Sequence, residues 1–370
     1  MVWNAAIAYN ELPQLPPTVE IETRGVLKAT IEARAALASL DQAARRITNP
    51  TVLINTIPLL EAQASSEIEN IVTTADDLFR FAQDEAAASN PATKETLSYR
   101  KALFAGIDLI RARPLSVTTA VDVCTIVKGR DMGIRKLHGT YIGNPTTQAA
   151  IYTPPAGEHV LRDMLSDWER FVHEPADIDP LVAMAVAHYQ FEAIHPFEDG
   201  NGRTGRILNV LMLMDVGLIS EPILYLSRYI IRNKDEYYRL LLAVTRDGSW
   251  EDWVIFVLEG IRQTALSTIA KIDQIQTLQD DVLLKIKRVT GGADADLLAV
   301  LFEQPYSRIA NVVQRCGVSR PTATKWLNDL VAEQVLDDVR VGRDRLFINT
   351  KFFDLLLRPE EAPPREETLF

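Results

Sequence analysis

The chain has 370 residues, of which 47% are hydrophobic and 24% charged, and its formal net charge is −11. This composition is typical of a globular protein of two or three domains, and the acidic balance argues against a nucleic-acid coat protein. No apolar run approaches the roughly 20 residues of a membrane span, and the first residues lack the basic start and apolar core of a signal peptide. Two isolated cysteines, Cys124 and Cys316, argue against a disulfide framework or a zinc site. We therefore expect a cytoplasmic protein with no membrane partner.

Residues 1–95 are expected to form an N-terminal helical region. After a proline-rich arm, leucine and isoleucine at helical spacing predict a first helix within residues 18–44. The segment from Leu59 to Asn70, LLEAQASSEIEN, has the pattern of an amphipathic helix whose N-terminus Ser65 or Ser66 would cap.

A long segment without helical periodicity follows the helices expected at residues 96–135. It runs from His138 to His159, HGTYIGNPTTQAAIYTPPAGEH, and combines Gly, Asn, Pro and Thr with short β-prone pieces. A plain surface loop is the simplest interpretation, but a loop of this length is often functional. Helical spacing resumes at residues 160–172 and continues at 181–194, so helices enclose the loop.

The stretch with the most chemical information is His195 to Arg206, HPFEDGNGRTGR. Apolar residues recur at spacings of three and four on both sides of it, which predicts a polar turn between two buried helices. Gly200 and Gly202 allow the backbone to approach a ligand closely, and the N–H groups at the start of the second helix attract an anion. Arg203 and Arg206 lie on one side of that helix, and their guanidinium groups fit phosphate oxygens.

Two further side chains of the turn indicate group-transfer chemistry. Asp199 offers the hard oxygen ligand that Mg²⁺ prefers, and Mg²⁺ is commonly held by one or two carboxylates together with substrate phosphates. His195 can exchange a proton near neutral pH. A base, a metal carboxylate, an anion cradle and a cationic clamp together indicate phosphoryl or nucleotidyl transfer.

Other motifs fit the turn less well. Gly200 to Gly205 satisfies the dinucleotide pattern GxGxxG, and Glu221 follows at about the right distance, but that motif needs a preceding strand and this turn follows a helical pattern. A Walker P-loop is excluded here because no GK[ST] follows. His188 lies on an apolar helix face and fits a hydrogen-bonded core histidine better than a metal ligand. The chain has no HxxxH or HExxH spacing, so zinc chemistry is not expected.

The turn resembles the signature of the Fic family, HPFx[D/E]GNGRxxR, and every defined position of that signature is filled. The resemblance implies a mainly α fold, with an all-helical Fic core at residues 96–275 and a small β-hairpin flap. It also implies that His195 deprotonates a target hydroxyl, that Asp199 holds Mg²⁺, and that the two arginines hold the β- and γ-phosphates of ATP. The nucleotide contacts that it assigns are Glu69, Ile151, Tyr152, Gly200, Asn201, Gly202, Arg203, Thr204, Gly205, Arg206, Tyr237 and Tyr238.

Two segments outside the turn gain a meaning from the resemblance. The long loop before the turn corresponds to the Fic flap, a hairpin that aligns a target peptide by β-augmentation. Ser65, Glu69 and Asn70 match the inhibitory pattern [S/T]xxxE[G/N], within an inhibitory helix expected at about residues 60–75. In the family this glutamate pairs with the second arginine of the signature, here Arg206, and so occupies the fork meant for the γ-phosphate.

Residues 290–358 have a second organisation, which resembles a winged helix-turn-helix. Its recognition helix would begin at Arg320, yet five basic and five acidic residues balance between Ser319 and Arg345, which supplies little of the phosphate attraction that DNA binding needs. A protein-interaction or dimerisation module is therefore favoured over a DNA-binding one. The tail, residues 359–370, is expected to be disordered. The expected helices are 296–302, 309–316 and 320–335, and the expected strands are 339–341 and 345–348.

Together these expectations describe a protein adenylyltransferase. It would use Mg²⁺ and transfer AMP from ATP to a Ser, Thr or Tyr hydroxyl of a target protein or of the chain itself, and Glu69 would inhibit it by pairing with Arg206. A homodimer is compatible with this interpretation. Two alternatives stay open: a transcription regulator whose Fic-type core senses a ligand, and a Fic enzyme that removes AMP or transfers another phosphate-containing group.

Overall fold

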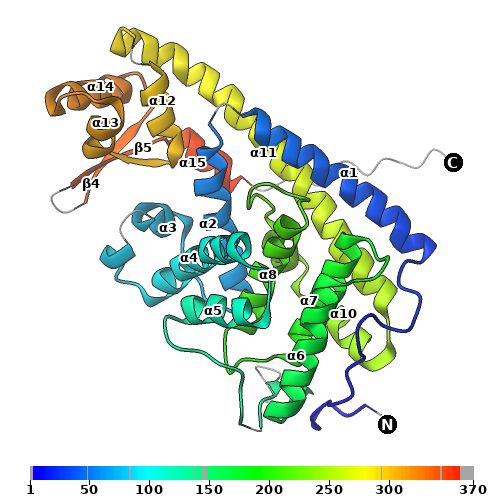
Figure 1. Ribbon diagram of the computed structural model, residues 1–370. Coiled ribbons are helices and arrows are strands. Elements are labelled where there is room, and N and C mark those ends of the chain that lie inside the picture. Colours follow the sequence, from blue (N-terminus) through cyan, green and yellow to red (C-terminus); the bar gives the residue numbers. More distant parts are fainter. Residues whose placement is uncertain are drawn as a thin grey trace.

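The protein is mainly helical, with two small antiparallel sheets, as the sequence predicts. Figure 1 shows the long helix α11 (Trp250–Thr290) running across the molecule, with α1 (Arg24–Arg46) packed along it. Within the described part of the chain, no helix combines the length and apolar character needed to cross a membrane. The computed structural model describes residues 3–47, 49–82, 85–137, 139–143, 147, 149–292, 294–341 and 344–358.

The remaining helices are short to medium in length, and α2, α4, α5, α6 and α10 pack against a central pair, α7 and α8. They are α2 (Thr51–Ile68), α3 (Ala75–Phe81), the 3₁₀ turn η1 (Glu85–Ala87), α4 (Pro91–Ala112), α5 (Val117–Lys128), α6 (Glu158–His173), α7 (Pro180–Ile194), α8 (Asn201–Asp215), α9 (Leu226–Arg232), α10 (Lys234–Asp247), α12 (Asp294–Glu303), α13 (Ile309–Cys316), α14 (Arg320–Ala332) and α15 (Thr350–Leu357).

Helix α7 lies at the centre of the core, and thirteen of its fifteen residues are buried. Two tryptophans from neighbouring helices fix its position. Trp168 of α6 donates from Nε1 to Ala187 O at 3.0 Å, and Trp253 of α11 donates from Nε1 to Ala185 O at 2.8 Å. A buried indole needs such a partner, so these bonds favour one position of α7. The turn that follows α7 therefore starts from a rigid support.

Helix α2 differs from its sequence-based prediction. We expected a helix at about residues 60–75, but α2 spans Thr51–Ile68 and passes through Pro58. Ser65 and Ser66 thus lie in its last turn, and the prediction that one of them caps its N-terminus is wrong. The helix ends because Asn70 adopts a left-handed backbone, with φ of +61°. The helix continues N-terminal to Pro58 because the residues of that first part bury an apolar face.

The predicted flap contains a minimal hairpin. Strand β1 (Ile142–Gly143) pairs antiparallel with β2 (Ala150–Tyr152). The N-terminal arm supports the chain that follows β2: Tyr9 N–H donates to Thr153 O at 3.0 Å, and Ala156 N–H donates to Asn10 Oδ1 at 2.9 Å. His138, at the predicted start of the flap, lies outside the described residues.

The C-terminal unit begins where α11 ends. Helices α12, α13 and α14 lie near the predicted positions, and a three-stranded antiparallel sheet of order β3-β5-β4 packs with them. Its strands are β3 (Tyr306–Arg308), β4 (Asp337–Val341) and β5 (Asp344–Ile348). The sequence analysis missed β3 and α15, because a three-residue strand and an eight-residue helix are too short to show a clear period. The predicted tail at 359–370 lies outside the described residues.

The predicted C-terminal boundary of the Fic core, residue 275, falls inside the continuous helix α11. This boundary and the other domain boundaries stay predictions. The C-terminal unit also contacts the N-terminal helices. Tyr306 Oη donates to the carboxylate of Asp76 on α3, and the rings of Phe79 and Phe353 meet edge to face with centroids 6.0 Å apart. The preference for a protein-interaction or dimerisation role of this unit over DNA binding stays a prediction.

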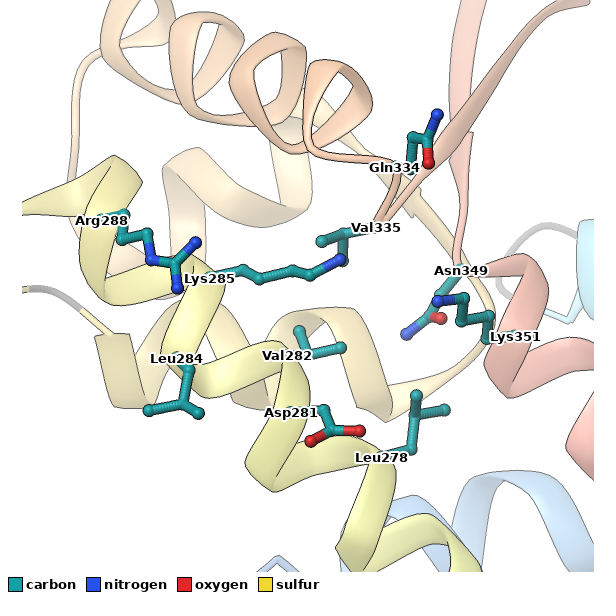
Figure 2. Close-up of a pocket in the computed structure, with 10 residues that line it drawn as sticks. All are labelled: Leu278, Asp281, Val282, Leu284, Lys285, Arg288, Gln334, Val335, Asn349 and Lys351. Atoms are coloured by element: carbon teal, nitrogen blue, oxygen red, sulfur yellow. The ribbon is translucent and has the colours of Figure 1, made fainter.

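A cavity of about 250 Å³ lies between α11 and the C-terminal unit (Figure 2). Leu278 and Val282 of α11 contribute apolar side chains, and Lys285 of the same helix reaches across to donate from Nζ to Glu333 O at 3.1 Å. This cavity shares no lining residue with the cavity at the signature turn. The cavity therefore lies where the two parts of the fold meet, apart from the signature turn.

Candidate active site

The signature turn is built on the end of α7. His195 follows the last helical residue and adopts a left-handed backbone, with φ of +50°, while its N–H still donates to Phe191 O at 3.0 Å. Asn201 holds the rest of the turn: Phe197 N–H donates to Asn201 Oδ1, and Asn201 Nδ2 donates to Phe197 O, both at 2.8 Å. These two bonds fix where α8 begins. They also occupy the Asn201 amide, so only its backbone N–H is left for the predicted anion hole.

Two glycines leave space at the start of α8. Gly200 is its N-cap, with φ of +87°, and a Cβ there would approach Lys128 Cδ to 3.2 Å and Cys124 Sγ to 3.3 Å. A Cβ on Gly202 would lie 2.2 Å from Glu69 Oε1. The first N–H groups of α8 have no intrahelical acceptor and form the positive end of the helix dipole. The helix start therefore favours an anion, and the Glu69 carboxylate already lies beside it.

Arg206 is held by the last turn of α2. Its Nε donates to Ser65 Oγ at 2.8 Å, and its Nη2 donates to Ser65 O at 2.9 Å and to Glu69 Oε1 at 2.7 Å. The Ser65 carbonyl is available because α2 tightens at its end, where Glu69 N–H donates to Ser66 O. The contact between Glu69 and Arg206 is thus present, and it joins residues 137 positions apart in the chain.

Both members of this pair are ionised near neutral pH. Burial alone would raise the pKa of Glu69, but the charge and hydrogen bond of Arg206 outweigh it and lower that pKa. Burial would likewise lower the pKa of Arg206, but Glu69 raises it above its usual value. Lys234 of α10 supports the pair from outside, because its Nζ donates to Ile68 O at 2.6 Å and to Asn70 Oδ1 at 3.4 Å.

Arg203 belongs to a second charged network, which involves α4 and α5. Its Nη1 donates to Glu95 Oε1 at 2.8 Å, and its Nη2 lies 3.9 Å from Asp199 Oδ1. Lys128 Nζ bridges the two carboxylates, 2.9 Å from Glu95 Oε1 and 2.6 Å from Asp199 Oδ2. Burial would raise the pKa of both carboxyl groups, but Lys128 and Arg203 outweigh it and lower both. Both carboxylates are therefore ionised near neutral pH.

Asp199 fits a divalent cation that arrives with a substrate. No group of three potential metal ligands occurs among His, Cys, Asp and Glu in the described part of the chain, so the protein alone offers no closed metal site there. The Asp199 side chain is 54% exposed and lies next to the glycine-lined helix start. One carboxylate combined with phosphate oxygens is a common Mg²⁺ arrangement. Asp199 therefore fits Mg²⁺ bound to a polyphosphate, and Lys128 now holds one of its oxygens.

The side chain of His195 is partly buried. Its Nδ1 is fully buried and has no hydrogen-bond partner among the described residues. Burial, followed by the nearby charge of Arg135, lowers the pKa of His195 to about 4. The imidazole is therefore neutral at pH 7 and able to accept a proton.

A cavity of about 290 Å³ opens beside His195. Tyr237 and Tyr238 of α10 form part of its wall: Tyr237 is buried and its Oη lies 2.9 Å from Nε2 of His188, while Tyr238 is 41% exposed. Burial lowers the pKa of His188 to about 3, which fits the expected neutral core histidine. The cavity is lined by Glu69, Ile142, Ile151, Tyr152, Tyr189, Glu192, Ala193, His195, Gly202, Arg206, Tyr237, Tyr238, Leu241, Leu242 and Thr245.

The structure separates the predicted nucleotide contacts into three groups. Gly200, Asn201 and Arg203 lie at the adjacent start of α8 and do not line the cavity. Thr204 is fully buried, and a Cβ on Gly205 would lie 2.5 Å from an oxygen of the neighbouring helix α7, so no side-chain role toward a nucleotide is supported for these two. The predicted contacts that line the cavity are Glu69, Ile151, Tyr152, Gly202, Arg206, Tyr237 and Tyr238.

The sequence analysis missed four ionisable residues of the site. Glu192 lines the cavity, its Oε1 is buried without a partner among the described residues, and burial raises its pKa to about 7. Its position three residues before His195, on one helix face, was an available signal. Glu95, Lys128 and Arg135 come from segments far from the turn in sequence, and their spacing carried no signal.

Comparison with known families finds three models that match this chain. The model described as Fic/DOC family N-terminal matches residues 27–108, and the model described as Fic/DOC family matches residues 122–213. The model described as Protein adenylyltransferase SoFic-like, C-terminal domain, matches residues 293–352. The three matches together span most of the chain, and the second contains the whole turn from His195 to Arg206.

Curated relatives carry adenylyltransferase names. Protein adenylyltransferase fic-1 of Caenorhabditis briggsae is 34% identical over 121 residues, which is 29% of this chain and 22% of that protein. Protein adenylyltransferase Fic of Nematostella vectensis is 35% identical over 115 residues, which is 30% of this chain and 25% of that protein. The chain thus spans about a quarter of the length of these relatives.

Solved structures share the fold. A Fic family protein from Desulfovibrio desulfuricans G20 superposes with a TM-score of 0.56 at 22% identity, over 91% of this chain and 98% of that one. Fic-1 of Caenorhabditis elegans, residues 134–508, superposes with a TM-score of 0.51 at 20% identity, over 67% of this chain and 74% of that one. The agreement with the first structure extends over nearly the whole of both chains.

Proposed function

This chain belongs to the Fic family, and we propose that it transfers AMP from ATP to a hydroxyl group of a target protein. The observation that carries the proposal is the turn from His195 to Arg206. There a neutral imidazole, a half-exposed carboxylate and two buried guanidinium groups surround the positive end of a helix. The adenylyltransferase names of the relatives support the same activity.

In this mechanism His195 is the base. The neutral imidazole takes the proton from a Ser, Thr or Tyr hydroxyl of the target, and the hydroxyl oxygen attacks the α-phosphorus of ATP. As the new O–P bond forms, the bond from the α-phosphorus to the oxygen that bridges to the β-phosphate breaks, and pyrophosphate leaves. The N–H groups at the start of α8, with Arg203 and Arg206, stabilise the phosphate charge. When bound to Asp199 and the phosphates, Mg²⁺ would supply further charge neutralisation.

The two ends of the site suit the two ends of ATP. Phosphates fit the charged start of α8, and the adenine fits the largely apolar cavity between the flap and α10, near Tyr238 and Ile151. The hairpin of β1 and β2 stands at the mouth of this cavity, since Ile142 and Ile151 line it. A target segment added to this hairpin would bring its hydroxyl toward His195.

We also infer that the resting enzyme is autoinhibited. Glu69 occupies the fork of Arg206 that would bind the γ-phosphate, and its negative charge would repel that phosphate. Ser65 strengthens the closed state, since it holds the remaining edge of the same guanidinium. Transfer would then require Glu69 to leave Arg206.

The test is a labelling reaction with each of the four α-labelled nucleoside triphosphates, Mg²⁺ and lysate proteins. The Glu69→Gly protein should transfer label from ATP, to itself or to a lysate protein. Adding His195→Ala should lower transfer by at least about 10²-fold, the lower range for loss of a general base, while ATP binding persists. If the Glu69→Gly protein transfers no label from any nucleotide, the proposed function fails. Removal of label from a modified lysate would favour the AMP-removing alternative.

A further inference from the structure

The end of α7 receives hydrogen bonds from the chain that surrounds the flap. Arg135 donates from Nη2 to Ile194 O at 3.2 Å, from Nε to His195 O at 2.8 Å, and from its backbone N–H to Pro196 O at 2.9 Å. Tyr152 donates from Oη to Ala193 O at 2.8 Å. The last carbonyls of a helix lack intrahelical partners, so the bonds to Ala193 O and Ile194 O satisfy the end of α7, and the bonds to His195 O and Pro196 O hold the turn that follows. They also fix the backbone on both sides of His195.

The same guanidinium contacts the far end of the flap. Arg135 precedes the flap, and its Nη2 also donates to Pro155 O, where the flap ends. One side chain therefore joins both ends of the flap to the turn. Arg135 is only 3% exposed, and burial lowers its pKa, but an arginine remains charged at neutral pH. Among the described residues no carboxylate forms an ion pair with it, so its charge acts on its surroundings without local neutralisation.

We propose that Arg135 is the positioning residue that fixes the left-handed backbone of His195 and sets the flap at a defined place relative to the imidazole. The inference rests on the proposed function, in which His195 is the base and the flap aligns the target. A left-handed backbone is unfavourable for a residue with a Cβ, so the His195 conformation needs support from its surroundings. An error of about 1 Å in the position of a reacting group can lower a rate 10²-fold.

The charge of Arg135 has a separate effect on the imidazole. After burial, it is the next largest cause that lowers the pKa of His195, while Glu69 and Asp199 act in the opposite direction. The carboxyl group of Glu192 lines the same cavity. Replacing Arg135 with a neutral residue should therefore raise the pKa of His195. A lysine would keep the charge but lose the planar fork that reaches several carbonyls, so substitution can separate charge from geometry.

The experiment compares Arg135→Gln and Arg135→Lys with the wild-type protein by NMR of the folded chain. The His195 signal is assigned by its loss in His195→Ala. We expect Arg135→Gln to raise the pKa of His195 by about one unit or more, and Arg135→Lys to raise it less. Both should shift the backbone amide signals of Ile194, His195 and Phe197. Lys136→Gln removes an exposed neighbouring cation and should change neither readout, so it is the matched control.

A second readout uses the activity of the Glu69→Gly background. Both Arg135 variants should lower kcat by at least about tenfold and leave the Kd for ATP unchanged, because the phosphate-binding groups lie on α8. Tyr152→Phe removes only the bond to Ala193 O and should lower kcat less. Melting curves establish that each variant is folded, and Arg135→Lys decides the question if Arg135→Gln does not fold.

The outcomes separate this inference from the proposed function. If folded Arg135→Lys leaves the amide signals of Ile194, His195 and Phe197 at their wild-type positions and the kcat at the value of the Glu69→Gly parent, or if Arg135→Gln leaves the pKa of His195 unchanged, the inference is overturned. If the Glu69→Gly protein transfers nothing, the proposed function fails. The NMR titration and the backbone signals still decide in that case whether Arg135 positions His195.

Discussion

The two arginines of the signature turn are held by partners from different neighbouring helices, and the two sides of the site that they form are built differently. On one side, a single buried guanidinium is paired with one carboxylate at the end of a helix that is distant in sequence. On the other side, two cations and two carboxylates form a network. We call them the α2 side, formed by Ser65, Glu69 and Arg206, and the α5 side, formed by Glu95, Lys128, Asp199 and Arg203.

Under the proposed function, this difference assigns regulation to the α2 side and the binding of metal and phosphate to the α5 side. On the α2 side one carboxylate blocks one guanidinium, so a single movement of Glu69 frees Arg206. On the α5 side two carboxylates share two cations, and the loss of one partner leaves the others paired. A perturbation of the α2 side should therefore act as a switch. A perturbation of the α5 side should act as a graded change in affinity for metal and phosphate.

The largest effect is expected from Glu69→Gly. A hydrogen bond to a charged group contributes about 1.5–3 kcal/mol, so freeing Arg206 should raise AMP transfer by about 10- to 100-fold. Initial rates of labelling measure the change. Arg206→Ala in the same background should abolish the gain, because the freed guanidinium is its cause.

Glu67→Gly is the matched control for this variant. Glu67 is exposed and lies in the last turn of α2, two residues before Glu69, so its replacement by glycine should loosen the end of α2 at least as much without removing the partner of Arg206. Equal activation by Glu67→Gly and Glu69→Gly would mean that loosening α2, and not freeing Arg206, raises the rate. An unchanged rate in a folded Glu69→Gly protein would remove the autoinhibition proposal.

The α2 side also shows where sequence reasoning reached its limit. The contact between Glu69 and Arg206 could be predicted because each residue belongs to a contiguous motif, the inhibitory pattern and the signature turn. The helix that presents Glu69 was misplaced, because Ser65 fits both a helix start and a last turn when only local spacing is known. Asn70 was the available signal for the helix end, since asparagine tolerates the left-handed backbone found there.

The α5 side was less predictable for a physical reason. Asp199 and Arg203 belong to the contiguous turn, so their chemistry could be read from twelve residues. Lys128 and Glu95 reach the turn only through the packing of α4 and α5 on α8, and no local pattern encodes that packing. Arg135 was missed for the same reason, because its partners are backbone carbonyls, which carry no sequence signature.

A smaller effect, in two directions, is expected on the α5 side. Asp199→Asn removes a carboxylate ligand and should raise the Mg²⁺ concentration for half-maximal transfer. Lys128→Met removes the cation that now holds Asp199 and should lower the Mg²⁺ concentration for half-maximal transfer. Partly exposed ion pairs contribute about 0.2–1 kcal/mol, so the shift for Lys128→Met should be no more than about fivefold. Mg²⁺ titrations of activity and of ATP binding measure both shifts, and Lys136→Met is the exposed control.

If Asp199→Asn and Lys128→Met shift the Mg²⁺ dependence in the same direction, the proposed competition between Lys128 and the metal is contradicted. Lys128 would then act on the phosphates directly and would not compete with the metal for Asp199. An unchanged titration in Asp199→Asn would exclude Asp199 as a metal ligand.

The smallest effect concerns Glu192, which lies close to the α2 side. Its pKa responds to the charges of Glu69 and Arg206. Burial raises the folded-state pKa of Glu192 to about 7, from an ordinary value near 4.5; Arg206 lowers it, and Glu69 raises it. A raised carboxyl pKa means that the folded state binds the proton more tightly than the unfolded state. The protein should therefore lose stability as the pH rises from about 4.5 through 7, where the buried carboxyl group ionises.

Glu192→Gln should remove this pH-dependent loss of stability. We expect a higher melting temperature than wild type at pH 8, from a gain of no more than about 3 kcal/mol, and little difference at pH 4.5. The exposed Glu198→Gln of the same turn is the control and should show no such pH dependence. In the Glu69→Gly background the gain at pH 8 should shrink, because the loss of the Glu69 charge lowers the pKa of Glu192. An equal gain in both backgrounds would mean that the charge of Glu69 does not affect the pKa of Glu192.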